Sequence, residues 1–146
     1  MRWLHVGIVA ALALDAAACA RTQKSSAGFH LPDGDAQHGQ QVFVDLKCNA
    51  CHRVDGIELP APVADPPVPV VLGGIVHQVR TDGELATAII EPTHHIAPGY
   101  RLAQVRAGNL SRMGDYSEQM TVRELIDLVA FLQSRYEVRP PPMAYK

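Results

Sequence analysis

The chain has 146 residues, of which 47% are hydrophobic and 19% are charged. This length fits one domain, and this composition excludes a disordered chain. The formal net charge is −2, from 13 Lys and Arg against 15 Asp and Glu, which excludes a basic face of the kind that binds nucleic acid. Three cysteines are too few for the disulfide framework of a small secreted scaffold. The composition predicts an ordinary globular domain, so the functional information must come from motifs.

The amino-terminal segment has the pattern of an export signal. Arg2 precedes the apolar or small residues 6–14, a run shorter than the roughly 20 residues that span a bilayer. Three alanines follow at 16–18, and Cys19 comes directly after them. This arrangement resembles the processing site of bacterial lipoproteins, in which the cysteine is acylated. We therefore expect residues 1–18 to be a signal peptide and Cys19 to carry a lipid anchor.

The segment after the cleavage site is polar and rich in small residues. We expect residues 19–33 to comprise the lipidated cysteine and a flexible tether. Ordinary cleavage after Ala18 or Ala20, without a lipid, is the alternative. We therefore expect export to place the domain outside the cytoplasm, on the periplasmic side of a bacterial membrane that it contacts through the lipid.

Helix caps and apolar spacing predict three helices in the mature chain. The expected helices lie at about 33–47, 81–91 and 121–136, with one or two further helical turns within 101–107. Five prolines between Pro60 and Pro69 favour an extended chain in that region. No segment has the alternation of a strand.

Cys48-Asn49-Ala50-Cys51-His52 is the most specific motif in the chain. The pattern C-x-x-C-H is typical of c-type haem attachment, because two thiols three positions apart can add to the two vinyl groups of one porphyrin. The adjoining His52 is then held beneath the iron. A thioredoxin-like redox pair would need a βαβ setting, and a zinc site would need further ligands such as His94-His95. We expect one covalent haem c.

Around this motif the sequence resembles the monohaem class I c-type cytochromes over about Gly34 to Tyr136. In that family, a helix with a glycine and an aromatic residue precedes the motif, as Gly39 and Phe43 do here. The last helix carries an aliphatic-Ala-aromatic-Leu pattern, which is present within 125–132. The resemblance implies that the first and last helices cross, with Gly39 permitting close approach near Phe131.

The same resemblance implies the fold class and the extent of the domain. It predicts an all-α protein with three to four helices around one covalently attached haem. This cytochrome c domain is expected at 34–137, before a Pro-rich tail at 138–146.

The resemblance also makes the loop residue Met113 the second axial ligand of the iron, although Gly114 stands where proline is common. Alternatives are Met120, Met143 and one of the histidines at 94–95. Met120 otherwise fills the core, and five histidines are expected to be solvated in loops: His30, His38, His77, His94 and His95.

Other groups are candidates for supporting roles around the cofactor. In this family a proline carbonyl usually holds the second ring nitrogen of the haem histidine, and the prolines within 60–69 offer several acceptors. Tyr100 and Tyr116 are candidates for contact with a haem propionate. Seven apolar residues are candidates for haem walls or plain core: Leu72, Ile75, Leu85, Ile89, Ile90, Leu102 and Val105.

These expectations favour a one-electron carrier over an enzyme. Its partners would be redox proteins, namely a dehydrogenase that donates electrons or an oxidase or reductase that accepts them, and it would bind no small-molecule substrate. Four arginines at 101–123 predict a mildly positive face beside the methionine loop. The alternatives are a haem subunit of a larger oxidoreductase complex, an open-site haem enzyme or gas sensor, and a structural lipoprotein without haem.

Overall fold

The computed structural model describes residues 29–61, 70–96 and 99–141. Within these ranges the helices are α1 (Ala36–Asp45), η1 (Cys48–Ala50), α2 (Asp82–Ile90), α3 (Leu102–Val105) and α4 (Val122–Gln133). No helix there is long and apolar enough to cross a membrane. The predictions for the export signal, for Cys19 and for Met143 lie outside the described residues.

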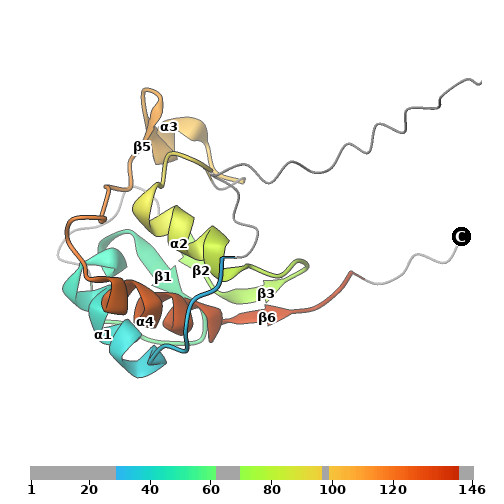
Figure 1. The fold of residues 1–146 in the computed structure, drawn as a ribbon. Helices are drawn as coiled ribbons and strands as arrows, with labels where there is room; N and C mark the ends of the chain where they lie inside the picture. Colours follow the sequence, from blue (N-terminus) through green and yellow to red (C-terminus); the bar gives the residue numbers. More distant parts are fainter. Residues whose placement is uncertain (1–28, 62–69, 97–98, 142–146) are drawn as a thin grey trace, which may run out of the picture.

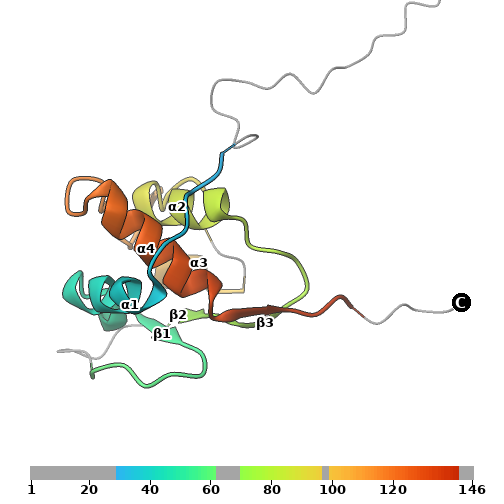
Figure 2. The ribbon, with the colours of Figure 1, turned by 60° about the horizontal axis from the view of Figure 1, so that its bottom comes forward.

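Helix α4 is the centre of the core. It packs against α1 on one side and against α2 on the other (Figures 1 and 2).

Capping boxes begin both α2 and α4, as the sequence predicted: Thr81 pairs with Glu84 and Thr121 with Glu124. Among the described residues, eleven hydrophobic side chains are buried: Val42, Phe43, Val54, Leu85, Ala86, Ile89, Ile126, Leu128, Val129, Phe131 and Leu132.

The predicted crossing of α1 and α4 is present, but its closest point differs from the expectation. A Cβ atom on Gly39 would overlap the backbone carbonyl of Asp127, so the approach is to Asp127 rather than to Phe131. One turn further along each helix, the rings of Phe43 and Phe131 meet edge to face with centroids 5.6 Å apart. A second glycine, Gly34, also lies against α4, because a Cβ atom there would be 2.7 Å from the carbonyl oxygen of Ile126.

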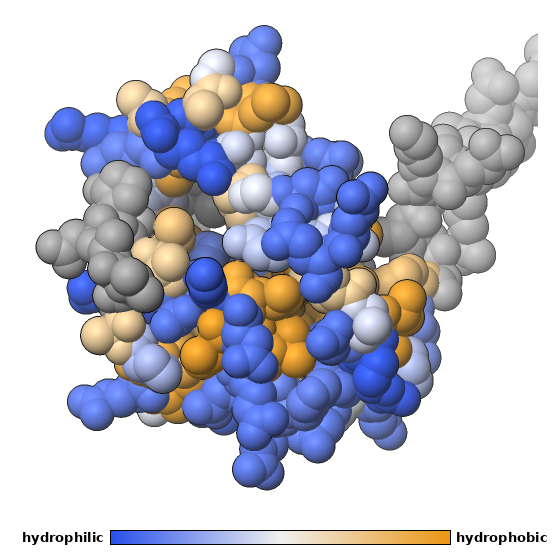
Figure 3. All heavy atoms as spheres, turned by 90° about the vertical axis from the view of Figure 1, so that its left-hand side faces the viewer, coloured by the Kyte–Doolittle hydropathy of each residue, from blue (hydrophilic) through white to orange (hydrophobic). Residues whose placement is uncertain are grey.

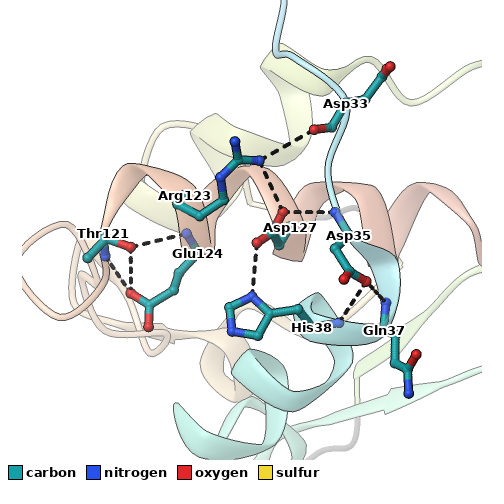
Figure 4. Close-up of polar contacts among 8 residues, drawn as sticks. All are labelled: Asp33, Asp35, Gln37, His38, Thr121, Arg123, Glu124 and Asp127. Atoms are coloured by element: carbon teal, nitrogen blue, oxygen red, sulfur yellow. Dashed lines mark hydrogen bonds and ion pairs between the residues drawn. The ribbon is translucent and has the colours of Figure 1, made fainter.

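A buried carboxylate fixes the polar side of this crossing (Figure 4). Asp127 is 2% exposed and accepts a hydrogen bond from the backbone N–H of Asp35 at 2.8 Å. His38 Nδ1 lies 2.9 Å from the other carboxylate oxygen of Asp127. The expectation of a loop position is therefore wrong for His38, which lies on α1 and is paired across the crossing, while its side chain remains 46% exposed.

This pairing makes a prediction for the pH dependence of stability. The hydrogen bond with Asp127 raises the pKa of His38 above the ordinary 6.5. Stability from protonated His38 is therefore present below pH 6.5 and is lost as the pH rises through the raised pKa. Thermal melting of wild type across this range should show the loss, and His38→Gln should flatten it. Exposed His95→Gln is the control, and equal pH profiles for wild type and His38→Gln would contradict the assignment.

Short strands, which no pattern in the sequence predicted, lie between and after the helices. They are β1 (His52–Val54), β2 (Val70–Leu72), β3 (Gly74–Val76), β4 (Arg106–Ala107), β5 (Leu110–Ser111) and β6 (Tyr136–Val138). The pairs β1–β2 and β3–β6 are parallel, and β4–β5 is antiparallel. Two or three residues are too few to show the alternation that identifies a strand in a sequence.

The seven candidate wall residues differ in burial, and Val105 on α3 is half-buried. Leu85 and Ile89 are buried on α2, and Leu72 packs against the core. Three others have exposed side chains: Ile75, Ile90 and Leu102.

Candidate haem site

The two motif cysteines lie on one tight turn directly after α1. Lys47 has a left-handed backbone conformation, with φ 58°, which redirects the chain from α1 into η1. The backbone N–H of Cys51 then donates to the carbonyl of Cys48 at 3.1 Å. In a 3-10 turn, side chains three positions apart lie on the same side. The local fold therefore presents Cys48 and Cys51 together, which suits two bonds to one porphyrin.

The environment of Cys48 favours an uncharged sulfur. Its side chain packs against the core, and burial raises the pKa of the Cys48 thiol to about 11. Reactive redox cysteines have lowered pKa values, so this environment does not suit a thioredoxin-like pair. A thioether sulfur carries no charge and suits the apolar contact. Both motif cysteines are free, and Cys51 is exposed.

His52 follows on β1, where backbone pairing with Val70 fixes its position. Burial lowers the pKa of His52, and the backbone of Val70 opposes this shift. Even so, the buried Nδ1 atom has no partner with acceptable hydrogen-bond geometry among the described residues. The ring lies 6.4 Å from that of Phe43, measured between centroids. His52 is thus held by strand pairing and by an aromatic neighbour.

The expected proline acceptor for His52 is not Pro60. The Pro60 carbonyl instead accepts a hydrogen bond from Asn49 Nδ2 at 3.0 Å, which closes the loop after the motif. The other prolines of that segment, which are Pro62, Pro66, Pro67 and Pro69, lie outside the described residues.

An open cavity of about 510 Å³ adjoins His52. Its apolar lining includes Val54, Ile57, Leu59 and Val71, whereas neither motif cysteine nor Met113 lines it. Figure 3 shows the face of the molecule that carries the loop before α4, where hydrophobic side chains gather around a hollow. Three charged residues also line this cavity, namely Arg53, Asp55 and Glu58, so the fit of a porphyrin rests on the shared turn of Cys48 and Cys51 directly before His52.

Met113 lies in the loop between β5 and α4 and is half-buried. Its backbone N–H donates to Ser111 Oγ at 3.1 Å. Met113 is not among the residues that pack against the core, whereas Met120 is, as expected of a residue that fills the core. His94 and His95 are exposed.

The loop that carries Met113 returns to the cysteine motif. Tyr116 packs against the core, and burial raises the pKa of its hydroxyl, with further increases from Cys48 and Cys51 nearby. Tyr100 is differently placed, because its hydroxyl accepts a long hydrogen bond of 3.4 Å from the backbone N–H of Val71. The structure thus brings the loop after Met113 to the cysteines.

A family model described as Cytochrome c matches residues 36–135, from the first residue of α1 to just beyond α4. The chain belongs to the class I c-type cytochromes. Comparison with curated proteins and comparison with solved structures gave no match. Members of the cytochrome c family bind covalently attached haem c, and haem c is therefore the cofactor of this cytochrome.

Sequence reasoning missed two features that shape the site. The pairing of His52 with Val70 joins segments on either side of the Pro-rich region, and neither strand has a sequence signal of its own. The contact of Phe43 with His52 was also missed. In the sequence, only the pattern of Gly39 and Phe43 before the motif indicated an aromatic ring near His52.

Proposed function

We propose that this cytochrome is a one-electron carrier whose haem is bonded to Cys48 and Cys51 and ligated by His52 and Met113. The family match supports a haem-binding electron carrier that is not an enzyme. The observation that carries the residue assignment is the turn η1, which presents both cysteines directly before a partly buried histidine. Met113 is assigned because it is half-buried and because Tyr116, which follows it in the same loop, lies near the two cysteines.

Each of these residues has a distinct part in electron transfer. Haem c supplies a one-electron couple between ferric and ferrous iron. The two cysteines fix the cofactor, and His52 gives a nitrogen ligand. The thioether of Met113 is a soft ligand that favours the ferrous state and closes the second axial position. Phe43 and its apolar neighbours keep water away from His52.

Optical spectra of the oxidised and reduced protein test this proposal. A carrier with two protein ligands should show a sulfur-to-iron charge-transfer band when oxidised and should not bind carbon monoxide when reduced. Carbon monoxide binding without denaturant would instead support the open-site enzyme or sensor. Colourless protein would support the structural lipoprotein, and a stable large assembly in size-exclusion chromatography of the native membrane extract would favour the complex subunit.

For its location, we propose export, removal of residues 1–18 and acylation of Cys19. The support is the apolar run at 6–14 followed by three alanines and a cysteine. A lipid at Cys19 would hold the haem domain at the periplasmic face of a bacterial membrane. The mass of the amino-terminal peptide of the mature protein tests this, because acylation adds a lipid mass that a Cys19→Ser variant lacks.

For its partners, we propose redox proteins with an acidic docking face. No Asp or Glu lies between Glu91 and Asp115, and Arg101 and Arg112 are exposed in that interval. Opposite charges accelerate association, and salt largely screens exposed charges that are farther apart than the Debye length of about 10 Å at 0.1 M.

The rate of electron transfer to such a partner should therefore fall as ionic strength rises. Replacing both Arg101 and Arg112 with glutamine should reduce this salt dependence. A flat salt profile for the wild-type protein would contradict the charge-steering proposal.

A further inference from the structure

Arg106 is the one described arginine with a buried side-chain nitrogen that lacks a hydrogen-bond partner. It lies on β4 and is half-buried, and its Nε atom has no acceptor among the described residues. The ion pairs found there involve Asp127 and Glu137, and none involves Arg106. A buried donor without an acceptor is destabilising, so this atom indicates a missing partner.

The sequence around Arg106 offers no carboxylate to fill that place. Residues 92–114 contain no Asp or Glu, although they contain three arginines. A carboxylate partner for Arg106 is therefore not supplied by its own hairpin or by the loop before it.

The segment that holds Arg106 has contacts that lead toward both proposed axial ligands. Arg106 pairs across the hairpin with Ser111, whose hydroxyl accepts from the backbone of Met113. Before the hairpin, Tyr100 contacts Val71, the neighbour of the residue that pairs with His52. Figure 1 shows α3 and β5 together at one end of the molecule, above α2.

We propose that Arg106 binds a haem propionate. A propionate is a carboxylate, and the guanidinium fork, which includes Nε, matches a carboxylate through two parallel hydrogen bonds. The cofactor thus brings the anion that the chain lacks around Arg106. This inference rests on the haem of the proposed function and assigns a residue that holds its charged edge.

Substitution in the haem-loaded protein tests the assignment. Arg106→Gln is compared with Arg101→Gln and Arg112→Gln, which remove the same charge from exposed positions in the same segment. The expected result is a changed propionate bending band in the resonance Raman spectrum of Arg106→Gln only. Its midpoint potential should fall by at least twice the shift of either control, because Arg106 is less exposed than Arg101 and Arg112 and its charge is therefore screened less. Arg106→Lys keeps the charge, so its midpoint potential should lie between those of Arg106→Gln and the wild type. Its propionate bending band should still differ from that of the wild type.

Equal potential shifts in all three glutamine variants with an unmoved band would overturn the proposal. Asp65 lies outside the described residues and is an alternative acceptor for Arg106. The proposal would therefore also fail if Asp65→Asn reproduced the Arg106→Gln spectrum. If the Arg106 variants do not fold, the wild-type ferrous protein decides by NMR. A nuclear Overhauser contact between the Arg106 side chain and a propionate methylene supports the assignment, and its absence rejects it. Protein without haem would reject the proposed function itself, whereas haem with no response at Arg106 rejects this inference alone.

Discussion

Replacing Gly39 with alanine is expected to destabilise the crossing of α1 and α4 and to reduce the yield of folded haem protein. The new Cβ atom would overlap the carbonyl of Asp127, a backbone atom of a central helix. Overpacking of this kind costs about 1–3 kcal/mol and occasionally more. That is a large part of a total stability of about 5–15 kcal/mol. Chemical denaturation of the purified protein, followed by its optical spectrum, measures the effect.

Gly114→Ala is the matched control for this prediction. A Cβ atom at Gly114 would have no neighbour within 4 Å, and the residue does not have a positive φ. This control should unfold at nearly the denaturant concentration of the wild type. A Gly39→Ala midpoint equal to that of the wild type would show that the helices do not approach as closely as the structure indicates.

Replacing Met113 with leucine is expected to remove the sulfur ligand while keeping an apolar side chain of similar size. The oxidised protein should lose its sulfur-to-iron charge-transfer band, and the reduced protein should bind carbon monoxide. The midpoint potential should fall on the order of 0.1 V, within the range of about 0.8 V that axial ligands set. The fall follows from losing a ligand that favours ferrous iron.

Met120→Leu is the control for the ligand assignment. Met120 packs against the core, so leucine should preserve both the band and the potential. Retention of the band in Met113→Leu would contradict the assignment of Met113 and would give the role to Met120 or Met143.

The helices were predictable because their signals are local. The capping boxes at Thr81 and Thr121 and the apolar stripe of α4 lie within single segments, and the structure confirms both helix starts. The haem motif is equally local, since five consecutive residues specify it. The approach of α1 to α4 came from the family resemblance, which named the glycine but misplaced its contact from Asp127 to Phe131.

The features that sequence reasoning missed join distant parts of the chain. His38 and Asp127 are 89 positions apart, and neither has a pattern that marks it as buried or paired. The strands β1 and β2 depend on pairing across the Pro-rich segment and not on any alternation of their own. The buried nitrogen of Arg106 likewise becomes visible only when the hairpin is folded.

The mass of the mature protein, purified and analysed under denaturing conditions, tests the central claim most directly. The account predicts one haem bonded to the peptide that contains Cys48 and Cys51, and no haem on that peptide when both cysteines are replaced with alanine. A polypeptide mass without an added tetrapyrrole would contradict the account.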